Sequence, residues 1–182
     1  MTAHAVLTRF VSPVAGIQAH LRGERPIAGG PRGQNDDQAE TLETTVWIRN
    51  LQPHAMPTGA PFRNLYVRLM AYDANGELIW QNAEGHPSED DPQAYFAYGL
   101  ADDMGHPAPP PTATKPGEDT RLQPHETREL TYEIPAEDTA LVRAELYYNL
   151  LWPSLVKKFS HLPEELTDPV MIAVSEKGFS HD

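Results

Sequence analysis

Residues 54–76 read HAMPTGAPFRNLYVRLMAYDANG, and this stretch decides the fold class. From 65 to 71, leucine, valine, leucine and alanine take every second position, with tyrosine, arginine and methionine between them. A period of two is typical of a strand that buries one face. The Asn-Gly pair at 75–76 suits a tight hairpin turn, and the apolar residues 78–80 follow it. The stretch therefore predicts an antiparallel β-hairpin.

Other segments repeat this texture of short β-branched and aromatic runs. We expect strands over 40–48, 120–122, 127–134, 141–151 and 170–174, each separated from the next by turn or loop residues. About seven short strands favour an all-β fold, an immunoglobulin-like antiparallel β-sandwich with long loops and one or two short helices. The predicted core consists of Val46, Ile48, Leu65, Val67, Leu69, Ile79, Leu130, Ile134, Leu141, Leu146, Tyr148 and Ile172.

The predicted domain organisation is one β-sandwich with an N-terminal arm. Residues 1–38 are rich in glycine and proline and are expected to form an extended arm or linker, in which 5–7 and 10–11 could pair as a short edge strand. Residues 39–182 are expected to form the β-sandwich domain. Within it, 81–119 is predicted as mostly loop, with a short helix over 93–100, and 154–166 as a helix broken at Pro163.

Composition excludes several classes of function. The net charge of -12 disfavours nucleic acid and anionic lipid surfaces as partners. No run of about 18 apolar residues is present, so no membrane insertion is expected. With no cysteine, the chain cannot attach a c-type haem through a Cys-x-x-Cys-His motif. The sequence also carries none of the common hydrolase or phosphate-binding motifs, so we expect it not to be an enzyme on its own.

Two blocks of sequence resemble the β-rich C-terminal domain of bacterial multihaem c-type cytochromes. In the first block a strand ends in Asn, a His precedes Pro-Thr-Gly, and a hairpin follows; in the second a strand leads into a Pro-containing turn with flanking charges. The matching residues are Val46, Ile48, Asn50, His54, Pro57, Thr58, Gly59, Pro61, Arg63 and 73–76, then Asp119, Arg121, Leu122, Pro124, Glu126 and Arg128, and later Leu146, Tyr147 and Tyr148. The resemblance covers roughly 40–174. Pro53 and His125 depart from it, because the family pattern has glycine at both positions.

The resemblance implies an accessory or interaction domain, itself non-catalytic, in a multihaem electron-transfer system. It implies a periplasmic or extracellular location, although the first residues contain no signal peptide. It also implies that His54, and more weakly His4, are candidate axial ligands to a haem carried by a partner or parent chain. For His54 there is an alternative interpretation, in which the imidazole bonds to the backbone and pins the Pro-Thr-Gly loop.

Two further hypotheses remain open. His54 with Met56, and Met104 with His106, are histidine and methionine pairs two residues apart, and imidazole with thioether suits Cu(I). The chain would then be a periplasmic copper-binding module, provided that the two loops converge. The aromatic residues Tyr95, Phe96 and Tyr98, if exposed, would instead favour a sandwich that binds carbohydrate or protein.

Overall fold

The computed structural model describes residues 10–11, 17–24, 41–158 and 161–179, and within them two antiparallel sheets face each other. The first sheet has the order β1-β2-β3-β8, formed by Phe10–Val11, Ile17–Glu24, Thr41–Asn50 and Thr127–Pro135. The second has the order β10-β9-β4-β6-β7, with β5 also paired to β4. Its strands are Asn64–Tyr72 (β4), Leu78–Gln81 (β5), Tyr95–Ala101 (β6), Lys115–Asp119 (β7), Leu141–Asn149 (β9) and Val170–Gly178 (β10). The all-β sandwich is confirmed; the immunoglobulin-like assignment stays a prediction.

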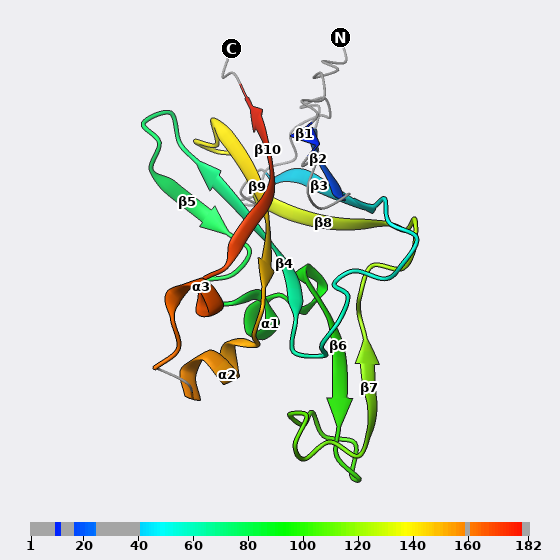
Figure 1. Cartoon of the computed structure of the whole chain (residues 1–182). Helices are drawn as coiled ribbons and strands as arrows, with labels where there is room; N and C mark the ends of the chain where they lie inside the picture. Colours follow the sequence, from blue (N-terminus) through cyan, green and yellow to red (C-terminus); the bar gives the residue numbers. More distant parts are fainter. Residues whose placement is uncertain (1–9, 12–16, 25–40, 159–160, 180–182) are drawn as a thin grey trace.

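Short helices lie on one side of the second sheet (Figure 1). They are α1 (Pro87–Asp90), α2 (Pro153–Lys158) and α3 (Glu164–Thr167), whereas the 3-10 turn η1 (Pro92–Ala94) contributes Ala94 to the core. The predicted break at Pro163 falls between α2 and α3. The outer face of this sheet is therefore partly covered, and Tyr66 and Met70 on it are buried.

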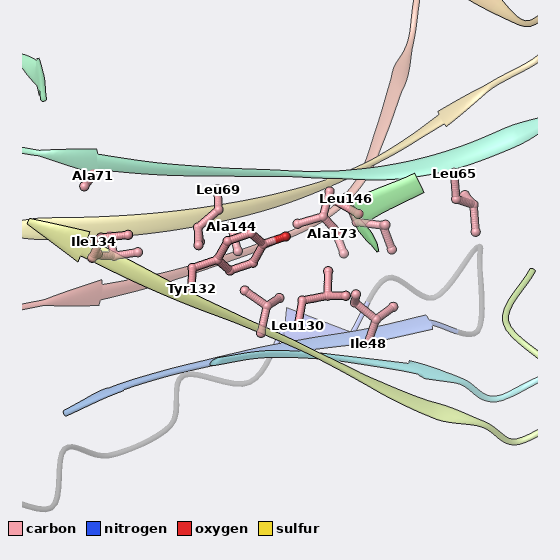
Figure 2. Packing of buried hydrophobic residues seen from close by; sticks show 14 of the residues in the cluster. Ile48, Leu65, Leu69, Ala71, Leu130, Tyr132, Ile134, Ala144, Leu146 and Ala173 are labelled. Carbon is pink, nitrogen blue, oxygen red and sulfur yellow. The ribbon is translucent and has the colours of Figure 1, made fainter. Parts of the chain in front are cut away.

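The core lies between the sheets (Figure 2). Leu130 and Ile48 from the first sheet point toward Leu69 and Leu146 from the second. Eight of the predicted core residues are fully or almost fully buried: Val46, Ile48, Leu65, Val67, Leu69, Leu130, Ile134 and Leu146. Tyr148 and Ile172 are partly buried against this core. Ile79 is not a core residue; its side chain is 37% exposed, because β5 is a short strand paired only with β4.

The predicted helix over 93–100 is wrong. Only Pro92–Ala94 makes a helical turn, and Tyr95–Ala101 is strand β6, which pairs with β4 and β7. Two prolines confine the helical turns to 87–94, and the aromatic residues beyond them gain more from cross-strand contacts than from helix formation. Residues 120–122 are likewise not a strand, although Leu122 makes an isolated bridge to Met56.

Part of the predicted arm joins the first sheet. Strand β2 pairs with β3 over its whole length, from Ile17 opposite Asn50 to Glu24 opposite Glu43, and β1 pairs with β2. The remainder of the predicted arm, which includes the proposed strand at 5–7, lies outside the described residues.

Candidate functional site

Two loops that follow different strands meet beside the end of β3. Met56 and Leu122 exchange two backbone hydrogen bonds, of 2.8 and 2.9 Å, and the Asn50 N–H donates to the Glu126 carbonyl at 2.9 Å. Figure 1 shows the two segments side by side, one running from β3 to β4 and the other from β7 to β8. We name residues 50–63 and 119–128 together the histidine platform. The two sequence blocks of the family resemblance thus form one surface.

Asn50 holds the histidine platform together from beneath. Its side chain is fully buried, and Nδ2 lies within hydrogen-bonding distance of three carbonyl oxygens, those of His54, Leu122 and Gln123, at 2.8, 3.1 and 3.0 Å. Its Oδ1 accepts from the Gln52 N–H at 2.9 Å. A buried amide with both ends bonded ties the loops in one arrangement. This explains why the strand ends in asparagine.

The His54 ring is exposed on the histidine platform. Its Nδ1 lies 3.2 Å from the carbonyl oxygen of Ala55. When Nδ1 carries the proton and donates to that carbonyl, Nε2 keeps its lone pair, and this is the tautomer that binds a metal through Nε2. The bond reaches only the adjacent residue, so the ring does not pin the Pro-Thr-Gly loop. Asn50 instead holds the His54 backbone carbonyl and joins it to the second loop.

The Pro-Thr-Gly loop is closed by Arg63. The peptide bond before Pro57 is cis, Gly59 has a φ of +90°, and Arg63 Nη1 donates to the Thr58 carbonyl at 3.2 Å. A Cβ added at Gly59 would lie 2.5 Å from Arg63 Nη1. The left-handed backbone therefore favours glycine here, whereas the guanidinium, at the end of a flexible side chain, could shift to admit a Cβ.

Charged pairs hold the second loop of the histidine platform. Arg121 donates to both carboxylate oxygens of Asp119, at 2.8 and 2.7 Å, and these bonds hold the pKa of Asp119 below its usual value. Arg128 Nε donates to Glu126 at 2.6 Å. His125 has a φ of 60°, a conformation that favours glycine, which matches the family pattern at this turn. Its ring is exposed, as is that of His54.

The four residues proposed to bind copper are not brought together. Met56 packs against the core and bridges to Leu122, whereas Met104, 81% exposed, and His106 lie in the connection between β6 and β7. Six residues lie between Leu122 and Lys115, where β7 begins, and an extended chain of that length puts the two pairs on the order of 20 Å apart. Figure 1 shows that connection at the far end of the ribbon formed by β6 and β7. Nor do the described residues contain a cluster of three or more His, Cys, Asp or Glu able to hold a metal ion. His4 lies outside the described residues.

A second group of chemically interesting residues lies on the outer face of the second sheet, and the sequence prediction missed it. His86 packs against Tyr66 and Tyr95, with ring centroids 4.5 and 5.6 Å apart, and Tyr66 stacks on Tyr147 at 5.2 Å. Burial, together with the nearby Arg68 cation, lowers the pKa of His86 to about 4. The one available signal was the period of two in β4, which puts Tyr66 and Arg68 opposite the core-facing residues.

A hollow adjoins this group at strand β6. A pocket of about 310 Å³ is lined by Tyr95, Leu100, Pro107 and Trp152, among others, and a neighbouring one of about 480 Å³ shares several of these residues.

The hypothesis of a sandwich that binds carbohydrate or protein requires an exposed aromatic surface. Phe96 is fully buried, so it cannot belong to such a surface. Of the helices in the described part of the chain, none combines the length and the apolar character needed to cross a bilayer.

Comparison with known proteins agrees with the family resemblance. Among solved structures the chain matches a penta-haem cytochrome c552 from Thermochromatium tepidum with 75% identity and a TM-score of 0.75. The match covers 80% of this chain and 37% of that chain, so this chain spans well under half of that cytochrome's length. The Northeast Structural Genomics Consortium target SoR45 aligns with a TM-score of only 0.37 at 15% identity, over 90% of this chain and 87% of that chain. No protein-family profile and no curated protein matches the chain. The chain is therefore a relative of one portion of a penta-haem cytochrome c552, a multihaem cytochrome.

Proposed function

We propose that this chain is a haem-free β-domain of a multihaem electron-transfer system outside the cytoplasm, in which it binds to, or continues into, a haem-bearing portion. The supporting observation is its 75% identity, over 80% of its length, to part of a penta-haem cytochrome. Without cysteine the chain has no covalent attachment point for a c-type haem, so the haems would belong to another portion or another protein. The role of this domain is then to bind and position, not to catalyse.

His54 is the residue we propose as the contact with iron. A bound haem supplies reversible one-electron transfer, and an axial histidine is one of the groups that set its potential. The residues present fit that role: the ring is exposed, and the Ala55 carbonyl 3.2 Å from Nδ1 favours the tautomer with a free Nε2. Asn50 holds the His54 backbone in place through the 2.8 Å bond to its carbonyl. The histidine platform would thus present one ligand at a fixed position.

An exchange of domains tests this proposal. The region of the penta-haem cytochrome c552 that matches this chain is replaced by this chain, which is a conservative change at 75% identity. The chimera should assemble with its haems, and His54→Ala should convert one low-spin haem to the high-spin form or replace its axial ligand, as seen by electron paramagnetic resonance. His125→Ala is the matched control, because it removes another exposed imidazole from the same surface.

Two results would count against the proposal in different ways. If the chimera does not assemble although the parent cytochrome does, the association itself is wrong. If it assembles and His54→Ala leaves every haem spectrum unchanged, the domain belongs to the system but His54 is not a ligand. His4→Ala in the same chimera tests the other candidate suggested by the resemblance.

A further inference from the structure

A row of aromatic rings crosses the outer face of the second sheet. Tyr147 of β9 lies opposite Tyr66 of β4, and Tyr66 lies opposite Tyr95 of β6, so the three residues share one cross-strand row. The rings of Tyr147 and Tyr66 are stacked, 5.2 Å apart and inclined by 16°, and His86 bridges Tyr66 to Tyr95. Stacked aromatic side chains at this spacing contact each other directly.

Of the three tyrosines in this row, Tyr147 is the one whose hydroxyl group donates to a carboxylate. Its O–H donates to Oε2 of Glu145 at 2.6 Å. Glu145 is only 8% exposed, and its other oxygen, Oε1, lies 2.7 Å from Arg143 Nε. Nη1 of the same guanidinium lies 3.1 Å from Glu176 Oε1. The carboxylate is thus fixed by a cation on one oxygen and receives the phenol on the other. A short bond of this kind, to an ionised acceptor, is a strong one.

We infer that Tyr147 is a redox-active tyrosine that loses one electron while its phenolic proton passes to Glu145, beside the stacked ring of Tyr66. The electron goes to a high-potential one-electron oxidant, of the class of oxidised metal complexes. The O–H bond of Tyr147 breaks and an O–H bond forms on Glu145 Oε2. The products are a neutral tyrosyl radical, a carboxylic acid and the acceptor reduced by one electron.

The surroundings of Tyr147 support this assignment. Burial and the bond to Glu145 raise its pKa to about 12, so at neutral pH the proton remains on the phenol until the electron leaves. Among the described residues Tyr132 also donates to a carboxylate, Asp91 Oδ2 at 2.8 Å, but that oxygen already accepts from Asn82 at 2.6 Å. Tyr132 is also only 8% exposed and belongs to the core, away from the row. Tyr147 combines two features: the carboxylate oxygen that accepts its proton accepts no second side-chain hydrogen bond from the described residues, and its ring is stacked on that of Tyr66.

The inference rests on the proposed electron-transfer function for its biological use, but its test needs no haem. The whole isolated chain is mixed with a photogenerated ruthenium(III) polypyridyl complex as the one-electron oxidant. Formation of the tyrosyl radical is followed by transient absorption and electron paramagnetic resonance, and a nitroso spin trap locates the radical by mass spectrometry. We expect the adduct mainly at Tyr147, with a rate that slows in deuterated water.

Three variants make the test specific. Glu145→Gln keeps a hydrogen-bond acceptor but cannot take the proton, and it should slow oxidation roughly ten-fold or more. Tyr147→Phe should abolish the major adduct, while Tyr98→Phe, which removes a tyrosine whose ring lies 4.7 Å from the Arg121 guanidinium, should change neither the rate nor the site. Circular dichroism checks that each variant is folded. An unchanged rate in folded Glu145→Gln, or a main adduct at Tyr132 or elsewhere, would overturn the inference whatever the result of the domain exchange.

Discussion

Asn50 shows how much of the histidine platform depends on a single side chain. Its amide bonds to three carbonyl groups from two loops and to the Gln52 N–H, and the Asn50 side chain itself is fully buried. The Leu122 carbonyl also accepts from the Met56 N–H, but the Asn50 amide is the group that joins all three carbonyls. A buried polar group left unsatisfied costs about 1–3 kcal/mol. The position of His54 therefore depends on a residue four positions away.

Replacing Asn50 by alanine should lower the free energy of unfolding by ~3 kcal/mol, because several buried partners lose their bonds at once. Urea denaturation followed by circular dichroism measures this. Asn75→Ala is the control: it lies in the exposed hairpin turn and should cost under ~1 kcal/mol. Equal losses in the two variants would show that Asn50 does not organise these loops.

Individual residues of the histidine platform could be predicted from sequence better than their contacts. The resemblance singled out Asn50, His54, Gly59 and Arg63, and each has a physical role in the structure. It could not show that Asn50 joins the two loops, because that depends on the second loop reaching the first across about 70 residues of chain. The Tyr147 and Glu145 pair was missed for a different reason: both sit in an ordinary strand pattern.

Helix α1 illustrates how a short element depends on one protonation state. His86 is its N-cap, and Nδ1 accepts from the Ser88 N–H at 3.2 Å. Only a neutral imidazole has that lone pair. Burial and the nearby Arg68 cation favour the same neutral form and lower the pKa to about 4.

Acid should therefore destabilise the fold through His86. The unfolded chain has a histidine pKa near 6.5, so between about 6.5 and 4 it binds more protons than the folded chain. The contribution is complete above about 6.5 and is lost as the pH falls through about 4. After allowance for solvent screening we expect a loss of ~1–2 kcal/mol. Denaturation at several pH values measures it, and His86→Asn, a cap that does not titrate, should flatten the difference; parallel pH curves for both proteins would refute the assignment.

Elements with a clear period of two were predicted well, and those formed by tertiary contacts were not. Strands β3, β4, β8 and β9 lie close to where the sequence indicated. A short helix is predicted where strand β6 lies because Asp90, Asp91 and Pro92 suit a helix start, with Gly99 keeping that helix short. The structure explains this glycine: a Cβ there would lie 2.5 Å from the Glu118 carbonyl of β7. Such a close approach of two backbones cannot be inferred from one segment alone.

For the whole molecule, stability comes from the shared core, so the two sheets should unfold together. Leu130 is 2% exposed and lies between the sheets (Figure 2). Leu130→Ala should cost ~3 kcal/mol through lost contacts and a cavity. Far- and near-ultraviolet circular dichroism should report one coincident transition. Val170→Ala, at a position 54% exposed, is the control and should change stability by under ~0.5 kcal/mol. Two separate transitions would mean that the sheets are independent units.

At this scale the fold class was accessible from sequence, but the pairing of strands was not. Alternation indicates that a strand has a buried face, without indicating which strand lies beside it. The first sheet joins β3 to β8 across more than 70 residues and recruits β2 from a segment that looks like a linker. Glycine and proline residues lie close to β2 in the sequence, and this composition predicts a flexible linker instead of a strand.

Strand β7 limits how these molecules can associate. It forms one edge of the second sheet, and its sequence, Lys115 to Asp119, contains Pro116 together with exposed charges. Proline has no N–H to give to a neighbouring strand, and charged edges resist pairing with another chain. The sheet therefore has no ready template on this side for a strand from a second copy. Concentrated protein should resist intermolecular β-sheet growth from this edge, so a partner strand that adds to the second sheet would have to approach it from the side of β10.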